Sequence, residues 1–474
     1  MKSQAYVPGD TIAAIATPQG PGAIGVIRLS GDRAVSLAAS LVTLANSRPL
    51  ASLEPRRAAL AVFHQNGTNL DRVLVTVFRA PHSFTGEDVV EISCHGGPAV
   101  MRRALELILA AGARAAEPGE FSQRAYLNGK MDLIQAEALA ELIRARTDLA
   151  VTAAFTRMEG GLSDRVRELR SSLIGVLALA EAALDHSDDA AVEEALARES
   201  AAGEKVLLAL ADVRALLATS SAGLLLRDGA RVTLAGRPNA GKSSLLNLLL
   251  GTQRAIVTPE PGTTRDTLEE GLDLDGVPAI LVDTAGIRSG SSDPVEKLGI
   301  ERARRSIEGS DAAIAVVDAS RLLSDEDRTV AGLLRGKPAG VVALNKSDLP
   351  SRVAPGGVRS LFPDYPVARV SALRGDGSAD LAKALREVLL ARAGVGGEGT
   401  VQGAVLVSSV RQKDCLERTA AALERALAVA DGKEMEECFA MEMREALDAL
   451  GEMAGETAPE DVLKRIFSSF CVGK

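Results

Sequence analysis

Gly236-Arg-Pro-Asn-Ala-Gly-Lys-Ser243 lies between two apolar runs, Ala230 to Ala235 and Leu245 to Leu250. This order predicts a strand, a glycine-rich loop and the start of a helix. The stretch fits the P-loop pattern G-x-x-x-x-G-K-S/T, in which backbone N–H groups and the helix dipole face phosphate. Lys242 supplies positive charge, and the hydroxyl of Ser243 is placed to hold Mg²⁺. The middle of the chain is therefore predicted to bind a nucleoside triphosphate.

Three later motifs, each directly after a predicted strand, select the nucleotide. Asp283-Thr-Ala-Gly286 offers a carboxylate that can reach Mg²⁺ through water and a glycine N–H that can face the γ-phosphate. Asn345-Lys-Ser-Asp348 offers a carboxylate that can accept two hydrogen bonds from the N1 and N2 edge of guanine, which adenine cannot supply. Ser371-Ala-Leu373 suits a backbone contact to the guanine O6. The motifs therefore predict GTP as the nucleotide. The predicted GTP-binding residues in the loop and these motifs are Asn239, Ala240, Gly241, Lys242, Ser243, Ser244, Asp283, Thr284, Ala285, Gly286, Asn345, Lys346, Ser347, Asp348, Ser371, Ala372 and Leu373. Thr258, Thr263 and Thr264, between the loop and Asp283, are also predicted to bind GTP.

Hydrolysis of GTP cannot follow the glutamine mechanism of Ras-type GTPases in this chain. The position after Asp283-Thr-Ala-Gly286 holds Ile287, which cannot orient water. Either the domain is a slow switch, or water is positioned from elsewhere and another cation replaces an arginine finger. Glu296 is a candidate for positioning the water, and an exposed charge on a helix is the alternative. Gly262-Thr-Thr-Arg-Asp266 supplies a hydroxyl that can complete the Mg²⁺ shell.

The composition indicates a soluble protein of several domains. The chain has 474 residues, which favours two to four domains, and a net charge of -9, which confines any RNA contact to a local patch. Its four cysteines form no C-x-x-C pair, so free thiols in a reducing cytoplasm are expected. Residues 1–10 lack a signal-peptide core, and no later uncharged stretch reaches about 18 apolar residues. The predicted location is cytoplasmic, without a membrane.

Hydrophobic patterning divides the chain into four parts. Short apolar runs between residues 11 and 119, with a helical stretch at 102–111, predict an α+β domain. Alanine-rich helical periodicity follows from Met131 and returns after a glycine-rich segment at 394–403, so the α/β segment between is predicted to be inserted into a helical domain. The acidic segment Asp185 to Glu194 is interpreted as a solvated loop or helix start rather than a metal site. The predicted fold is multidomain, with ranges 1–130 (α+β N-terminal domain), 131–228 and 394–474 (the two parts of an all-α domain), and 229–393 (an inserted α/β P-loop G domain).

Several stretches together resemble the family of the tRNA modification GTPase MnmE, also called TrmE. The block from Gly236 to Asn247 with the motifs after it is shared with the related GTPases Era and Der, whereas the flanks resemble MnmE alone. These flanking stretches are Asp10-Thr-Ile-Ala-Ala-Ile-Ala-Thr-Pro18, Ile27-Arg-Leu-Ser-Gly31, Ser83-Phe-Thr-Gly-Glu-Asp88, Glu120-Phe-Ser-Gln-Arg-Ala-Tyr-Leu-Asn-Gly-Lys130 and Phe470-Cys-Val-Gly-Lys474. The resemblance covers essentially the whole chain.

The resemblance implies an architecture, partners and a reaction. It implies an N-terminal domain that binds folate and forms a homodimer, a helical domain, and a G domain inserted into the helical domain. It also implies a heterotetramer with an FAD-dependent protein similar to MnmG, or GidA. This complex is expected to add an aminomethyl-type group to C5 of the wobble uridine, position 34, of certain tRNAs. The expected one-carbon donor is 5-formyltetrahydrofolate or a related tetrahydrofolate.

The resemblance further implies how the nucleotide site holds its metals. K⁺ would be coordinated by Asn239, Thr258, Glu260 and Thr263, and could neutralise developing charge as an arginine finger does. Mg²⁺ would be held by Ser243 and Thr264, while Glu296 would act as the catalytic residue that positions water. Glu260 departs from the family, which has an apolar residue there more often, but its carbonyl is the expected ligand. A small insertion at Ser289 to Ser292 means that the assignment of Glu296 depends on flanking residues.

Four charged residues match positions that line the folate site of the family. They are Arg28, Glu91, Lys130 and Lys474. A carboxylate can accept from the N–H edge of a pterin, and cations can meet a glutamate tail. Without the family, each is interpreted as an ordinary surface charge. The resemblance also places Cys471 near the folate and tRNA chemistry, and a packed thiol is the alternative.

Two other functions compete with a tRNA-modifying enzyme. One is a GTP-switched RNA-binding ribosome assembly factor similar to Era or Der. An Era-like chain carries a KH domain with a G-x-x-G clamp and a Der-like chain carries a second P-loop, and neither pattern is evident here. The other is a scaffold whose flanking domains have no folate site.

Overall fold

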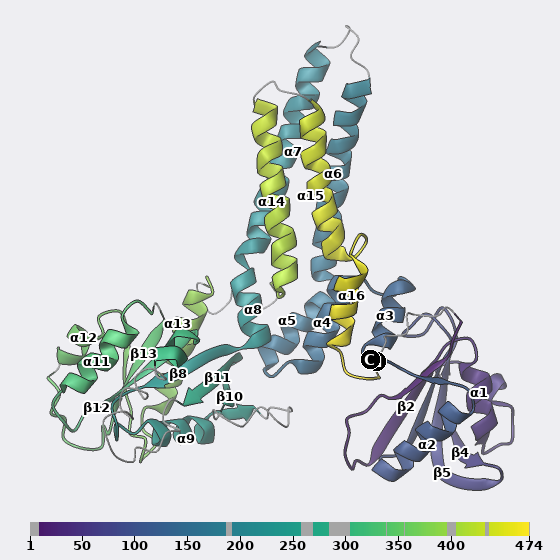
Figure 1. Ribbon diagram of the computed structural model, residues 1–474, viewed down its shortest axis with the longest axis horizontal. Coiled ribbons are helices and arrows are strands. Elements are labelled where there is room, and N and C mark those ends of the chain that lie inside the picture. Colours follow the sequence, from purple (N-terminus) through teal and green to yellow (C-terminus); the bar gives the residue numbers. More distant parts are fainter. Residues whose placement is uncertain are drawn as a thin grey trace. The chain divides into compact units, whose positions relative to one another are not determined.

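The computed structural model describes residues 9–185, 192–256, 269–283, 304–337, 339–354, 356–395, 404–431 and 436–473. It contains two compact units, one of Met1–Ala140 with Gly451–Lys474 and the other of Glu141–Leu450 (Figure 1). The four domain ranges expected from the sequence divide the chain more finely than these units and stay predictions.

The first unit is built on a seven-stranded sheet in the order β3-β4-β5-β6-β2-β1-β7. All its neighbouring strands are antiparallel except β1 and β7. Helices α1 (Ala34–Leu41) and α2 (Pro98–Ala110) share a buried core with alternate residues of the sheet, because successive strand residues point to opposite faces. The α+β domain is confirmed. The strands are β1 (Ile12–Ile15), β2 (Ile24–Ser30), β3 (Val42–Leu44), β4 (Ala59–Gln65), β5 (Thr68–Phe78), β6 (Val89–His95) and β7 (Arg114–Ala115).

Three further helices have residues in this unit. These are α3 (Glu120–Leu127), α16 (Glu460–Ser468) and α4 (Leu133–Arg144), which continues into the second unit. Phe467 and Phe470 pack with Leu133 and Ala136, so residues near the C-terminus share a core with residues near position 130.

Long helices from both sides of the G domain pack together in the second unit. Helix α7 contacts both α6 and α14, although α7 and α14 are separated in sequence by the whole G domain (Figure 1). This contact confirms the predicted insertion. Apolar residues of α6 spaced three or four apart from Leu162 to Val176 are buried, and Gly160, with φ 102°, separates α5 from α6. The helices are α5 (Asp148–Met158), α6 (Gly161–Asp185), α7 (Val192–Ala218), α8 (Ser220–Asp228), α14 (Val410–Asp431) and α15 (Glu436–Ala454).

One helical stretch, Ala202–Asp228, is long and apolar enough to cross a membrane by length and composition alone. It includes most of α7, whose residues Val206, Leu210 and Val213 are buried. Because α7 packs against α6 and α14, helix packing within this unit explains its apolar face.

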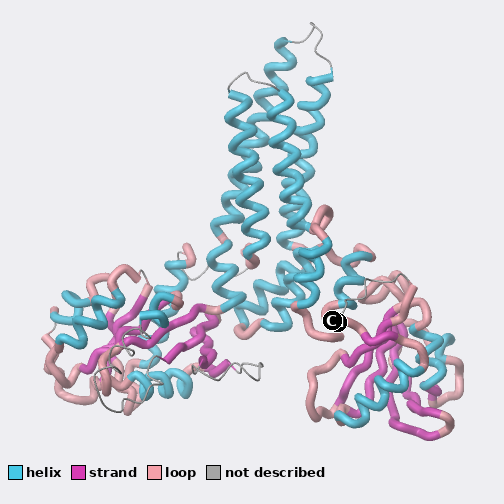
Figure 2. Tube along the Cα trace, in the orientation of Figure 1, coloured by secondary structure: helices cyan, strands magenta, loops and turns pink. Residues whose placement is uncertain are grey.

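The G domain is built on a second seven-stranded sheet, in the order β14-β13-β12-β8-β11-β10-β9. Its strands are drawn in magenta and its helices in cyan in Figure 2. Strands β14 to β11 in this order are parallel, and β10 and β9 are antiparallel additions. The carboxyl ends of the parallel strands therefore meet at one edge, where ligands of open α/β sheets bind. The strands are β8 (Ala230–Ala235), β9 (Arg254–Ile256), β10 (Glu269–Leu274), β11 (Val277–Asp283), β12 (Ala312–Asp318), β13 (Gly340–Asn345) and β14 (Val367–Arg369), and the helices are α9 (Lys242–Thr252), α11 (Asp325–Leu334), α12 (Gly357–Leu361) and α13 (Ser378–Arg392).

Candidate functional site

The loop between β8 and α9 has the backbone of a phosphate cradle. Asn239 and Gly241 both adopt left-handed conformations, with φ of 60° and 97°. Successive N–H groups in such a turn point to one concave side, which favours an anion. Gly236 admits no side chain, since a Cβ there would lie 2.6 Å from the carbonyl oxygen of Val316. The structure thus requires glycine at position 236 because of the close backbone of Val316, and it favours glycine at position 241 because of the left-handed backbone.

Lys242 lies across this loop at the N-terminus of α9. Its Nζ donates hydrogen bonds to the carbonyl oxygens of Gly236 and Arg237, at 2.8 and 3.0 Å. Ser243 and Ser244 are exposed in the first turn of the same helix. This end of α9 therefore offers an ammonium group, two hydroxyls and the N–H groups of a helix N-terminus, which can bind phosphate and Mg²⁺.

Asn345 ties the end of β13 to two neighbouring loops. Its side chain is buried, Nδ2 donates to the carbonyl oxygen of Ala240 at 2.9 Å, and Oδ1 accepts from the N–H of Ala372 at 3.0 Å. A Cβ on Gly241 would overlap with this amide. One side chain thus fixes the P-loop relative to the loop that follows β14.

Lys346 and Ser347 continue this connection. Lys346 adopts a left-handed backbone, with φ 63°, and its Nζ donates to the carbonyl oxygen of Asn239 at 3.1 Å and to Asp318 at 2.7 Å. The N–H of Ser347 donates to the carbonyl oxygen of Val370 at 3.1 Å. The segment predicted to recognise the base is therefore held from both sides.

Asp348 lies at the open edge of the sheet with a fixed carboxylate. Its Oδ1 accepts from the hydroxyl of the buried Ser371 at 2.6 Å. This hydrogen bond holds the pKa of the Asp348 carboxyl below its ordinary value, so the group is ionised at neutral pH. The side chain of Leu373, in the same loop as Ser371, is 86% exposed at this edge. The arrangement suits a ligand that donates hydrogen bonds, as the guanine edge does.

Two residues of this site were not predicted from the sequence. Arg237, in the P-loop, lies 3.3 Å from Asp318 and 3.6 Å from Asp327. Asp318 ends β12 as Asp283 ends β11, so an acidic residue at the end of an apolar run was the available signal.

Several predicted residues lie outside the described part of the chain. They are Thr258, Glu260, Thr263, Thr264, Thr284, Ala285, Gly286, Ile287, Glu296 and Lys474. Asp283 is described only as the last residue of β11. The described half of the nucleotide site therefore consists of the P-loop and the two loops predicted to meet the base.

The first unit brings together Arg28 and Glu91, two residues predicted to bind folate. They are directly opposite on β2 and β6, and Nε and Nη2 of Arg28 donate to Oε1 of Glu91 at 2.9 and 2.8 Å. Nη1 of Arg28 donates to the carbonyl oxygen of Gly473 at 3.3 Å. The guanidinium also lies 5.3 and 5.7 Å from the ring centres of Phe84 and Phe121. A carboxylate, a cation and aromatic rings thus meet beside the C-terminal segment.

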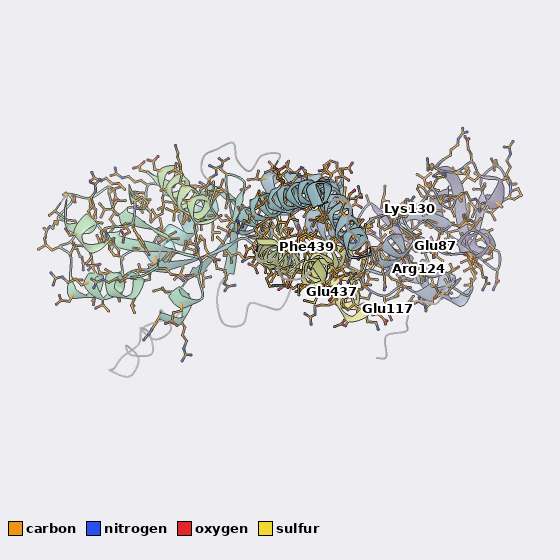
Figure 3. All side chains as sticks on the ribbon, turned by 90° about the horizontal axis from the view of Figure 1, so that it is seen from above. Glu87, Glu117, Arg124, Lys130, Glu437 and Phe439 are labelled. Carbon is orange, nitrogen blue, oxygen red and sulfur yellow. The ribbon has the colours of Figure 1, made fainter. Side chains whose placement is uncertain are left out.

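Two other residues assigned to this chemistry, Lys130 and Cys471, are described in the same unit. Lys130 is exposed, and its Nζ donates to the carbonyl oxygen of Pro81 at 3.0 Å (Figure 3). Cys471 is exposed, and its carbonyl oxygen accepts from the N–H of Gly119 at 3.4 Å. Its neighbour Val472 forms a bridge with Pro118.

A buried ionic cluster lies in the same unit, and its partners are far apart in sequence. Arg124 is fully buried, with Nη2 donating to Asp10 and to Glu120, the latter at 3.0 Å. Nη1 donates to Glu87 at 3.1 Å, and Figure 3 labels Arg124 and Glu87. Burial raises the pKa of the Asp10 and Glu120 carboxyls, but hydrogen bonds from Arg114 and Arg124 outweigh it and hold both pKa values below their ordinary range. Because its charges are paired with one another, the cluster fits a structural role.

Known proteins resemble the chain along almost its whole length. The model of the MnmE helical domain matches residues 133–471, and the model of the N-terminus of the GTP-binding protein TrmE matches residues 11–130. The tRNA modification GTPase MnmE of Moorella thermoacetica is 42% identical over 98% of this chain and 99% of its own. The protein of the same name from Chloroflexus aurantiacus is 45% identical over 98% and 100%.

Solved G-domain structures match a smaller part. The G domain of the Thermotoga maritima FeoB iron transporter is 28% identical, covers 34% of this chain and 98% of its own, and has a TM-score of 0.27. Era from Aquifex aeolicus is 26% identical, with coverage of 41% and 66% and a TM-score of 0.26. Relatives that match from end to end carry the assignment. The predicted family, fold class and class of enzyme are confirmed, and the chain belongs to the MnmE family of tRNA modification GTPases.

Proposed function

We propose that this chain is a K⁺-stimulated GTPase that takes part in modifying C5 of the wobble uridine of certain tRNAs. The observation that carries the nucleotide part is the connected base site. Asn345 joins the P-loop to Ala372, and Asp348 presents an ionised carboxylate that Ser371 fixes in place. The tRNA part is supported by membership of the family, whose relatives are named tRNA modification GTPases.

The described residues have separate tasks in nucleotide binding. The N–H groups of the P-loop and the ammonium of Lys242 bind the phosphates. The carboxylate of Asp348 accepts from guanine N1–H and the 2-amino group, which selects GTP over ATP. Ser243 is exposed at the start of α9, where its hydroxyl fits a Mg²⁺ ligand together with Thr264.

Asn239 fits the proposed K⁺ site through its side chain. Its backbone oxygen already accepts from Lys346, while its side chain is exposed on the phosphate-binding loop. With Thr258, Glu260 and Thr263, this amide would coordinate K⁺, which supplies positive charge beside the phosphates when bound. Glu296 then positions the attacking water in place of the glutamine that Ile287 replaces.

The N-terminal unit is proposed to bind a tetrahydrofolate at Arg28, Glu91, Lys130 and Lys474. Glu91 supports this because its Oε1 accepts hydrogen bonds from Arg28, while no described residue donates to its Oε2, which can therefore accept from the N–H edge of a pterin. Cys471 has an exposed thiol and lies two residues before Gly473, whose carbonyl oxygen accepts a hydrogen bond from Arg28. A homodimer through this unit, and a heterotetramer with an MnmG-like FAD protein in the cytoplasm, complete the proposal.

The nucleotide proposal is tested by GTP turnover in matched salts. Replacing KCl by NaCl should slow turnover sharply if K⁺ replaces an arginine finger. Glu296→Ala should abolish turnover and leave GTP affinity near that of the wild type, whereas Glu326→Ala, an exposed acidic residue of α11, should change neither. Equal turnover in both salts would contradict the K⁺ site.

The tRNA and folate proposals need separate measurements. Nucleoside analysis of tRNA from cells that lack this protein should show loss of a C5-modified wobble uridine; an intact modification contradicts the proposal. The full chain should bind 5-formyltetrahydrofolate. Glu91→Ala should lose this binding, and Glu106→Ala, on the exposed side of α2, should keep it. Binding unchanged by Glu91→Ala would favour a scaffold without this folate site.

A further inference from the structure

Asp318 occupies a nearly closed position between the P-loop and the base-recognition segment. Its side chain is 1% exposed. One carboxylate oxygen, Oδ1, accepts from the N–H and the hydroxyl of Ser320 at 2.9 and 2.6 Å. The other, Oδ2, lies 2.7 Å from Nζ of Lys346 and 3.3 Å from Nη2 of Arg237. One buried carboxylate therefore holds a cation from each of two nucleotide-binding segments.

The position of Asp318 is fixed by the strand that it ends. All seven residues of β12 are buried, and β12 is paired on both sides, with β8 and β13. A charge at such a place is unfavourable unless it is paired and hydrogen-bonded, and Asp318 meets both conditions. The strand therefore fixes the position of the carboxylate, and the side chains of Lys346 and Arg237 are held against it.

Lys346 depends on this attachment. It is a long side chain on a left-handed backbone, only 31% exposed, and its Nζ reaches Asp318 and the carbonyl oxygen of Asn239. Asp348 follows two residues later. The orientation of Lys346 therefore sets both the contact with the P-loop and the start of the segment that presents Asp348.

We propose that Asp318 is a positioning residue of the guanine-nucleotide site, which it organises by holding Lys346 against the P-loop. The assignment rests on the proposed nucleotide function and concerns the same site. Both carboxylate oxygens of Asp318 are engaged by protein groups, so Asp318 acts through the ammonium of Lys346 and not by contact with the nucleotide. Arg237 pairs with Asp318 and also with Asp327, so the charges of two cations, Lys346 and Arg237, are neutralised by two carboxylates.

Asp318→Asn tests this role in the full chain, with binding of a fluorescent N-methylanthraniloyl GDP as the readout. The dissociation constant should rise about tenfold, because a charge-assisted hydrogen bond to Lys346 is weakened. Asp327→Asn is the matched control, since Asp327 is also buried and pairs with Arg237 but not with Lys346 among the described residues. Its dissociation constant should change by no more than about twofold. Equal losses in the two variants would overturn the assignment.

Lys346→Met tests whether Asp318 affects nucleotide affinity through Lys346 or only through the general stability of the domain. Methionine keeps the unbranched stem and removes only the ammonium. If Asp318 acts through Lys346, Asp318→Asn should weaken binding no further in the Lys346→Met background. Fully additive losses would overturn the proposal. If Asp318→Asn does not fold, GDP affinity unchanged in Lys346→Met overturns it as well. Absence of GDP binding by the wild-type chain would instead refute the proposed nucleotide site.

Discussion

Replacement of Arg124 by methionine should destabilise the N-terminal unit by a predictable amount. The fully buried guanidinium pairs with Asp10, Glu87 and Glu120. Arg114 also binds Asp10 and Glu120, at 2.7 and 2.5 Å, so these two carboxylates keep a cation in the variant. The carboxylate of Glu87 keeps only the hydroxyl of Ser30 as a hydrogen-bond donor among the described residues. We therefore expect the variant to lose the stabilisation of one buried ion pair and not of three. The free energy of unfolding of this unit should fall by about 3–5 kcal/mol.

Hydrogen exchange measured by mass spectrometry on the full chain is the suitable assay, because it reports each unit separately. The free energy of opening should fall by about 3–5 kcal/mol for amides of β1 and α3 and stay unchanged for β12 in the G domain. Arg103→Met, at a half-exposed residue of α2, is the control, with an expected change within about 0.5 kcal/mol. A fall of less than about 1 kcal/mol in β1 and α3 would show that the buried pair of Arg124 with Glu87 does not stabilise this unit.

The same variant should change the response of this unit to acid. The native pKa values of Asp10 and Glu120 are lowered, so their stabilisation is complete above the unfolded pKa values of about 4 and is lost as the pH falls through the lower native values. Removing Arg124 removes some of the hydrogen bonds that lower the pKa values of Asp10 and Glu120. The difference in opening free energy between wild type and variant should therefore shrink from pH 7 toward pH 3. A constant difference would show that the ionic contacts are not its source.

Two further changes probe the second unit. Asp348→Asn should weaken GDP binding at least about tenfold and favour xanthosine diphosphate, because the new amide can donate to the 2-oxo group of xanthine; in a competition assay, an unchanged preference for GDP would contradict the predicted base contact. Gly223→Ala should destabilise the helical domain by about 1–3 kcal/mol, because the added methyl group would overlap with the carbonyl oxygen of Val407. Hydrogen exchange in α8 and in residues 404–409 measures this effect, and unaltered exchange there would show that the backbone contact can relax.

The candidate nucleotide site could be proposed from the sequence because each of its motifs is a short continuous stretch. Each motif directly follows an apolar run of strand length, and parallel strands bring their carboxyl ends to one edge. The contact of Asn345 with Ala240 and Ala372 then follows from the fold, but no spacing in the sequence indicates it. Likewise, composition alone indicated that helices before and after the G domain pack together, and the contact of α7 with α14 confirms it.

The ionic networks could not be predicted in the same way. Asp10 and Arg124 are separated by 114 residues, and each looks like a surface charge in its own segment. Whether a charged residue is buried depends on the elements that pack over it, which hydrophobic periodicity does not specify. Asp318 is an intermediate case, because its place at the end of an apolar run indicates the sheet edge but not its two cations.

The insertion of the G domain links its nucleotide site to the helical domain over a short distance in sequence. Helix α8 ends at Asp228, Gly229 turns the chain with φ 78°, and β8 begins at once and ends at the P-loop. The chain that returns from the G domain meets α8 at Gly223, where Val407 leaves no room for a side chain. The N–H of Val407 also donates to the hydroxyl of Thr219 at 3.0 Å. Because the returning segment contacts α8, from which the outgoing segment leaves, both connections of the G domain to the helical domain meet at this one helix.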